Sequence, residues 1–415
     1  MNESFLRQHV LDRFLRYIAI DTQSSHERAD AGIQPSTEGQ IELGNLLVTE
    51  LIQMGLTNTK IDENGYVLAH LPASTGLENK PSFGLCSHLD TAAEASGKNV
   101  KAQIVDKYDG SVIHLSEGHS IDPATDSALA ACVGETIITS DGTTLLGADN
   151  KAGIAGIMTL VHYLTENPEI QHGPIEIVFS PDEETGHGMD RIPLEKITSK
   201  AFYTVDGGQV GEIETECFNA WKCDVVFTGI AAHLGTARGK MVNAVSMAAS
   251  FVSALPARES PETTSGYEGY FCPLEINGSG ETASVTVYLR DFDLSEMEKK
   301  LDRVDVFATA IEAQFPGGKV SVTRTKQYLN MKEKLDRAPH VLELLKRAAK
   351  NAGVATSMSP IRGGTDGSRL TEMGIPTPNI FTGGHNFHSR IEWASLEQMT
   401  AMVKTLIELA KVWGE

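Results

Sequence analysis

Apolar residues recur at helical spacing in several segments of the chain. In the first of these, residues 5–20, apolar side chains stand three or four positions apart, as in a helix that buries one face. The same pattern predicts further helices at 41–54, 152–164, 341–352 and 396–412. Shorter apolar runs predict buried strands at 82–87, 144–148, 175–179 and 202–205. Strands that alternate with helices are typical of an α/β fold.

The pattern changes after residue 208. Two stretches alternate between apolar and polar residues, as half-buried strands do, at 220–227 and 283–289. Two others have helical spacing, at 242–255 and 296–315. From about residue 332 the earlier pattern resumes. We therefore expect a first domain with a mixed sheet and helices on both faces, made of residues 1–216 and 329–415 and interrupted by a smaller α+β domain at 217–328.

Composition narrows the class of protein. Hydrophobic residues make up 41% of the 415 residues and charged residues 22%, which is ordinary for a soluble globular protein. No apolar run approaches the roughly 20 residues that span a bilayer. The N-terminus lacks a basic start followed by an apolar stretch, so we expect a cytoplasmic protein. A net charge of −20 argues against nucleic acid as a partner, because a phosphate backbone requires a basic face.

Candidate chemistry begins with two adjacent acids, Glu183 and Glu184, which follow the apolar run 175–179. Neighbouring side chains at a strand end point to different sides. One acid can therefore hold a cation while the other transfers protons. Acidic pairs are also common in solvated loops, so the pair alone does not decide between these interpretations.

Other potential metal ligands follow the remaining apolar runs. His88 and Asp90 come after 82–87, Asp149 after 144–148 and Asp206 after 202–205. In open α/β sheets, ligands collect at the carboxyl ends of the strands. Each residue also has an ordinary alternative, such as a helix N-cap for Asp149 or a turn for Asp206. His388, in a glycine-containing segment near the C-terminus, completes the set.

The number of ligands predicts two cations. The five cysteines include no Cys-x-x-Cys pair, so any metal is held by histidines and carboxylates, which suit Zn²⁺, Co²⁺ or Mn²⁺. We expect Asp149 to bridge two cations, with one completed by His88 and Asp206 and the other by Glu184 and His388. Glu183 is then free to act as a general base. Asp90 is expected to accept the other ring N–H of His88.

Longer motifs strengthen this interpretation. The segments around the predicted ligands resemble motifs of the two-zinc metallopeptidase family that also includes carboxypeptidase G and aminoacylase. These segments are Ser87-His88-Leu89-Asp90-Thr91, 146–153, 181–184 and 204–208. Later segments resemble the peptidase T group of tripeptide aminopeptidases within it, at 235–237, 241–244, 259–263, 266–269, 289–293, 360–367 and 381–384. Departures from the usual pattern, such as Asn150 and Leu234, remove no ligand.

The resemblance implies a mixed-sheet catalytic domain and an inserted lid or dimerisation domain, with two Zn²⁺ per chain and Co²⁺ or Mn²⁺ as substitutes. It implies Glu183 as base, a cis peptide bond at Asp149–Asn150, and His233 as an oxyanion-polarising residue that domain closure delivers. It also implies a homodimer through the inserted domain. Candidate residues for binding the substrate are Arg290, Arg362, Asn243 and Gly364.

The implied activity is removal of the N-terminal residue from short peptides, tripeptides above all. A dipeptidase, a carboxypeptidase or an N-acyl amino acid hydrolase would share the same metal ligands, and a non-catalytic homologue would bind peptides or metals only. The sequence does not identify the acceptor for the α-ammonium of the substrate. Asp182 is one candidate among the surplus carboxylates.

Overall fold

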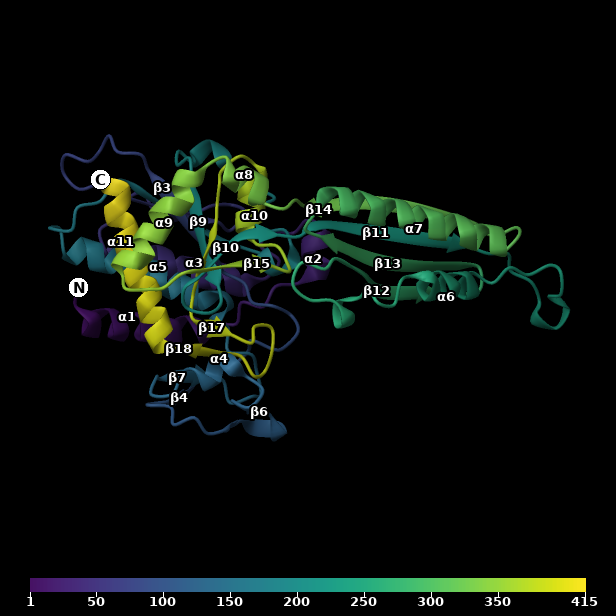
Figure 1. Ribbon diagram of the computed structural model, residues 1–415, viewed down its shortest axis with the longest axis horizontal. Coiled ribbons are helices and arrows are strands. Elements are labelled where there is room, and N and C mark those ends of the chain that lie inside the picture. Colours follow the sequence, from purple (N-terminus) through teal and green to yellow (C-terminus); the bar gives the residue numbers. More distant parts are fainter. The chain divides into compact units, whose positions relative to one another are not determined.

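The computed structural model describes residues 1–415 and divides the chain into two compact units (Figure 1). The first comprises Met1–Thr215, Glu333–Ser359 and Thr365–Glu415. The second comprises Glu216–Lys332 and Pro360–Gly364. The second unit thus includes a short later segment, 360–364, in addition to the stretch that the sequence predicted as an insertion.

The first unit contains a mixed eight-stranded sheet, as expected. Its strand order is β1 (Lys60–Ile61), β2 (Val67–Leu71), β8 (Ile175–Ser180), β3 (Phe83–His88), β9 (Phe202–Gly207), β16 (Asn379–Phe381), β10 (Glu212–Cys217) and β15 (Ser357–Ile361). The central strands β8, β3, β9 and β16 are parallel. Outside them, β2 and β10 pair antiparallel. The parallel centre brings the carboxyl ends of β8, β3 and β9 to one edge.

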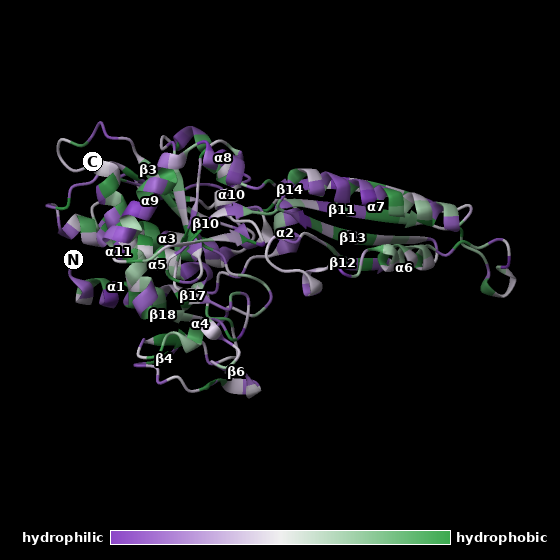
Figure 2. Cartoon of the chain, viewed as in Figure 1, coloured by the Kyte–Doolittle hydropathy of each residue, from purple (hydrophilic) through white to green (hydrophobic).

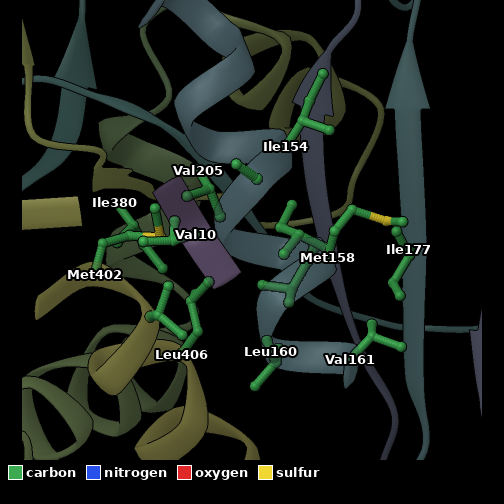
Figure 3. Packing of buried hydrophobic residues seen from close by; sticks show 14 of the residues in the cluster. Val10, Ile154, Met158, Leu160, Val161, Ile177, Val205, Ile380, Met402 and Leu406 are labelled. Atoms are coloured by element: carbon green, nitrogen blue, oxygen red, sulfur yellow. The ribbon is translucent and has the colours of Figure 1, made fainter. Parts of the chain in front are cut away.

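Five long helices build the main core of this unit. They are α1 (Glu3–Ile18), α3 (Glu38–Gln53), α5 (Ala148–Glu166), α9 (Pro339–Asn351) and α11 (Leu396–Gly414). Met158 of α5 and Met402 and Leu406 of α11 are fully buried in one cluster with strand residues such as Ile177, Val205 and Ile380 (Figure 3). Each such side chain contributes about 1.5–3 kcal/mol when it leaves water. The short helix α10 (Asp366–Glu372) contacts β9 and places Leu370 in a separate buried cluster.

A glycine lets α5 approach β9 closely. A Cβ at Gly153 would collide with the carbonyl oxygen of Val205. Because α5 follows the segment that carries Asp149, this close packing fixes that segment against the strand that carries Asp206.

A smaller antiparallel sheet supports the loop that carries His388. Its order is β17 (Gly384–His385), β18 (Trp393–Ser395), β7 (Ile137–Thr139) and β4 (Gln103–Val105). The hairpin β5 (Ile113–His114) and β6 (Ser120–Ile121) and the short helices α2 (His26–Asp30), α4 (Ser127–Ala130) and α8 (Lys332–Asp336) complete the main elements outside the second unit. The sequence did not predict these strands, since two or three residues are too few to show a period.

The second unit is an antiparallel sheet covered on one face by two helices. The strand order is β12 (Tyr270–Gly278), β13 (Thr282–Asp291), β11 (Asn219–Thr228) and β14 (Lys319–Tyr328), and the helices are α6 (Ala244–Ala254) and α7 (Leu294–Gln314). Along β13, Val285, Val287 and Leu289 are buried while the residues between them are half-buried. The long helix α7 carries hydrophilic and hydrophobic residues around its circumference (Figure 2).

Two predictions about elements were wrong. The segment 144–148 is not a strand, because Leu145 N–H donates to Ser96 and the next two N–H groups donate to Glu392, so no ladder forms. The inserted sheet has four strands instead of two. In β12 and β14 most side chains are exposed or half-buried, which weakens the alternation that reveals a strand. No helix combines the length and the apolar character needed to cross a bilayer.

Candidate metal centre

The structure brings the five predicted ligands together at one edge of the large sheet. His88 ends β3, Asp206 is the penultimate residue of β9, and Glu184 lies in a 3₁₀ turn, Glu183–Thr185, just after β8. Asp149 lies in the non-helical start of α5, where the Asp149–Asn150 peptide bond is cis, as the resemblance implies. His388 lies in the loop between β17 and β18. Their role as ligands stays a prediction.

Asp149 faces both histidines, one with each carboxylate oxygen. His88 Nε2 lies 2.8 Å from Asp149 Oδ1 and 3.4 Å from Asp206 Oδ1. His388 Nε2 lies 3.1 Å from Asp149 Oδ2 and 3.0 Å from Glu184 Oε2. The residues thus form two groups that share Asp149, with the same partners that the sequence predicted for two cations.

Burial and crowding of like charges perturb these groups. Burial raises the pKa of Glu184 to about 8, and the charge of Asp149 adds to the effect. Burial raises the pKa of Asp206 to about 6 in the same way. For Asp149 burial acts in the same direction, but the hydrogen bonds with His388 and His88 outweigh it and lower the pKa. The carboxylates therefore repel one another unless positive charge lies between them.

One buried carboxylate oxygen in the site lacks a hydrogen-bond partner. Glu184 Oε1 is buried and has no hydrogen-bond partner, which costs about 1–3 kcal/mol or more for a polar atom. One ligand atom each of His88, Asp149 and Glu184 lies within 4.8 Å of the others. Nitrogen and oxygen donors at this spacing fit a divalent cation of the zinc type. A cation would satisfy Oε1 and relieve the repulsion between the carboxylates.

Asp90 fixes the two acids that follow β8. Its oxygens accept the backbone N–H groups of Glu183 at 3.0 Å and Glu184 at 3.1 Å, and Oδ1 lies 3.3 Å from His88 Nδ1. Asp90 is fully buried. It therefore ties the tip of β8 to the tip of β3, a wider role than the contact with His88 that the sequence predicted. Burial, with the charges of Asp206 and other nearby acids, raises the pKa of Glu183 above its ordinary value.

Asp182 is not available to a substrate. It is fully buried, and its carboxylate accepts hydrogen bonds from Ser36 N–H at 2.8 Å and Gln40 Nε2 at 2.7 Å as well as from the Ser36 hydroxyl. Asp182 adopts a left-handed backbone conformation, with φ at 57°. It positions the turn before Glu183, so the suggestion that it accepts the substrate ammonium was wrong.

The sequence did not predict two buried acids near the proposed ligands. Glu392 is 1% exposed and accepts three backbone N–H groups of the Asp149 segment, from Leu146 and Gly147 at 2.8 Å and from Asp149 at 3.0 Å. Asp366, at the start of α10, accepts a hydrogen bond from the Ser180 hydroxyl. Burial raises the pKa of Asp366 to about 7. Asp366 lies within the 360–367 motif. The only sequence signal for Glu392 is its position four residues after His388.

The other predicted site residues belong to the second unit. His233 is exposed and precedes the 3₁₀ turn Leu234–Thr236. Asn243 is the N-cap of α6, and its Oδ1 accepts from Val245 N–H at 2.9 Å and Ser246 N–H at 3.3 Å. Gly364 packs against the ring of Tyr328, which leaves no room for a Cβ.

Both predicted arginines of the second unit are held by local contacts. Arg290 is 9% exposed, donates to the Leu289 carbonyl at 2.9 Å, and lies over the Tyr288 and Tyr328 rings. Arg362 is half-buried and donates through Nη1 to the carbonyls of Gly266 and Glu268 at 2.7 and 2.9 Å. These contacts orient each guanidinium group, and binding of a substrate carboxylate stays a prediction for both.

A mixed sheet with clustered histidines and carboxylates at the ends of its parallel strands defines a class of metal-dependent hydrolases. The family model for peptidase family M20/M25/M40 matches residues 139–412, and the chain belongs to that family. The chain is a peptidase, and the family resemblance seen in its motifs is confirmed.

Relatives agree with this assignment, and solved structures share the fold. Peptidase T of Geobacillus thermodenitrificans is 43% identical over 99% of both chains, and Peptidase T of Clostridium perfringens is 44% identical over 98% of this chain and 99% of its own. The aminopeptidase PepT from Bacillus cereus matches with a TM-score of 0.75 at 23% identity, covering 99% of both chains. A tripeptidase from Staphylococcus aureus matches with a TM-score of 0.76 at 23% identity, covering 98% of both.

Proposed function

We propose that this peptidase is a two-metal aminopeptidase that removes the N-terminal residue from short peptides, tripeptides above all. The observation that carries the proposal is Asp149, which faces His88 with one oxygen and His388 with the other. Relatives named Peptidase T, and a related solved structure described as a dinuclear metal-binding peptidase, support it. We propose zinc as the metal, with cobalt or manganese as substitutes, and the cytoplasm as the compartment.

The proposed ligands are His88 and Asp206 on one side of Asp149 and Glu184 and His388 on the other. When bound, two divalent cations would acidify a shared water and polarise the carbonyl group of the scissile bond. The partnerless Glu184 Oε1 supports this assignment, because a buried carboxylate oxygen is otherwise left without a counter-charge.

Glu183 acts as the general base in this proposal. As the neighbour of the proposed ligand Glu184, it would take a proton from the attacking water and return it to the leaving amine. Burial raises the pKa of Glu183 above its ordinary value. Asp90 keeps Glu183 in place by accepting its backbone N–H at 3.0 Å. Two adjacent acids therefore have separate roles.

The second unit supplies the remaining proposed groups. His233 is exposed and would polarise the oxyanion. Arg290, Arg362, Asn243 and Gly364 are the proposed contacts for the rest of the peptide. Closure of the inserted lid domain would bring these groups to the reacting bond and exclude water.

A peptide panel tests the proposed function. The protein is stripped with a chelator, reloaded with Zn²⁺, Co²⁺ or Mn²⁺, and given dipeptides, tripeptides and tetrapeptides with free or acetylated N-termini. We expect cleavage only after reloading, fastest with free tripeptides, and release of the first residue. Preference for dipeptides, release of the last residue, or cleavage of acetylated substrates would instead indicate a dipeptidase, a carboxypeptidase or an N-acyl amino acid hydrolase. Absence of all cleavage would contradict the proposal.

A further inference from the structure

An aminopeptidase must recognise the positively charged amino group at the start of its substrate. A carboxylate near the scissile bond is the natural partner, since a charge-assisted hydrogen bond to an ammonium group is short and strong. Given the proposed function, a carboxylate of the first unit is expected to bind this ammonium group.

Most carboxylates around the proposed metal centre are already engaged. Asp90 and Glu392 accept backbone N–H groups, Asp182 accepts hydrogen bonds from Ser36 and Gln40, and Asp366 accepts one from Ser180. All four are buried. Glu183 and the proposed ligands have roles of their own. None of these groups is free to meet an incoming cation.

Glu94 is different. Its side chain is 61% exposed, and its Oε1 lies 3.6 Å from Nδ1 of His388, on the side of the ring opposite to Asp149 and Glu184. This distance is too long for a hydrogen bond, so Glu94 meets His388 only as a loose ion pair. A largely exposed carboxylate without a hydrogen bond to His388 therefore stands at the rim of the proposed metal centre.

The backbone around Glu94 is held at both ends. On one side, Thr91 N–H donates to the Thr22 carbonyl at 3.3 Å and the Thr91 carbonyl accepts from Ser24 at 3.1 Å. On the other, the Ser96 carbonyl accepts from Leu145 N–H at 3.0 Å. Between these anchors, Ala92 and Ala95 are buried while Glu94 points outward. The segment presents the carboxylate from a fixed base, as a recognition group requires.

We propose that Glu94 binds the α-ammonium group of the peptide substrate and so selects free N-termini. The substrate is a short peptide whose first residue carries a protonated amine. An acetylated N-terminus offers Glu94 an amide in place of a cation. A free carboxylate at the same position would be repelled by Glu94.

The test compares Glu94→Gln with the wild-type protein, with trialanine as substrate and propionyl-dialanine as competitive inhibitor. Propionyl-dialanine has the same shape as trialanine but lacks the amino group. Both proteins are loaded with the same metal. We expect Glu94→Gln to lower kcat/KM for trialanine by about 10- to 100-fold, mainly through KM, and to leave the inhibition constant of propionyl-dialanine unchanged. Glu195→Gln, at an exposed acid of the 3₁₀ turn Leu194–Lys196, should match the wild type with both compounds.

Each other outcome overturns the inference in a recognisable way. If Glu94→Gln cleaves trialanine as well as the wild type, Glu94 does not bind the ammonium group. If it weakens inhibition by propionyl-dialanine as much as it weakens cleavage of trialanine, and binds metal more weakly by calorimetry, Glu94 orients His388 instead. If the wild-type protein cleaves no peptide, the proposed function fails first, and the inference about Glu94 fails with it.

Discussion

At the scale of single residues, the neighbouring acids Glu183 and Glu184 differ because of how their backbone is held. Asp182 turns the chain sharply after β8, and Asp90 accepts both following N–H groups. The two side chains then start from one anchored turn, yet only Glu184 contacts His388. The proposed separation of roles therefore depends on the buried acids Asp90 and Asp182, which hold this turn.

The first prediction concerns these two acids. Glu183→Gln should lower kcat by about 10²- to 10⁴-fold while metal binding stays close to that of the wild type, because the base is lost and the ligands remain. Glu184→Gln should lower metal affinity as well. Steady-state kinetics and metal analysis after dialysis distinguish the two variants. Full activity of Glu183→Gln would refute the proposed mechanism.

A second residue-scale prediction concerns Glu392, which positions Asp149 through three backbone N–H groups. In Glu392→Gln, one acceptor oxygen becomes an NH₂ group that faces backbone donors. We expect the free energy of unfolding to fall by about 1–3 kcal/mol and metal affinity to fall as well. Urea denaturation and calorimetry measure these effects, with Glu195→Gln as control. A loss of stability with unchanged metal affinity would limit Glu392 to a structural role.

At the scale of elements, the turn after β8 is attached to the helix α2 by a histidine. His187 Nδ1 lies 2.7 Å from Asp190 Oδ2, and its Nε2 lies 3.1 Å from Asp30 Oδ1. The hydrogen bond to Asp190, followed by that to Asp30, raises the pKa of His187 from 6.5 to about 9. The protonated ring therefore links the 182–190 segment to α2 at neutral pH.

This linkage predicts a pH-dependent contribution to stability. Because the folded-state pKa is raised, the contribution is complete below about pH 6.5 and is lost as the pH rises through about 9. His187→Gln should therefore lower the melting temperature at pH 6 and change it little at pH 10. Thermal melts across this range, with His70→Gln as an exposed control, measure the difference. An equal effect at both pH values would contradict the assignment.

In the whole molecule, the two units contain different parts: one carries the proposed catalytic residues and the other has a separate core. The first unit contains all five proposed ligands and the base, and the second has its own core beneath α6 and α7. The outer strand β12 of the second unit exposes Leu274 and Ile276, at 56% and 53%. An exposed apolar edge strand is a ready site for pairing with another chain.

We therefore expect the protein to form a homodimer through the inserted domain. Replacing Leu274 and Ile276 together with lysine should shift the sedimentation coefficient toward that of a monomer, because each chain would bring two positive charges to the paired strands. Ile52→Lys, at an apolar residue equally exposed on the first unit, is the control. If the wild-type protein is monomeric at all concentrations, the prediction is wrong.

Local sequence patterns were enough to predict the long helices, most of the buried strands and the motifs that carry the proposed ligands. These features are local: a helical stripe, an apolar run or a His-x-Asp spacing reports on neighbours in the chain. The strands with weak alternation, such as β12, and the false strand at 144–148 mark the limit of that information. In both, the pairing of backbone groups depends on partners far along the chain.

The contacts that hold the site join segments far apart in the chain. Glu392 accepts the N–H of Asp149, 243 positions away, and Asp182 accepts hydrogen bonds from Ser36, just before α3, and from Gln40 in its first turn. Nothing in the local pattern separates these acids from Glu94, which is exposed and within ion-pair distance of His388. What a carboxylate can do depends on its burial and on its hydrogen-bond partners. Its surroundings are assembled from segments that meet only when the chain folds.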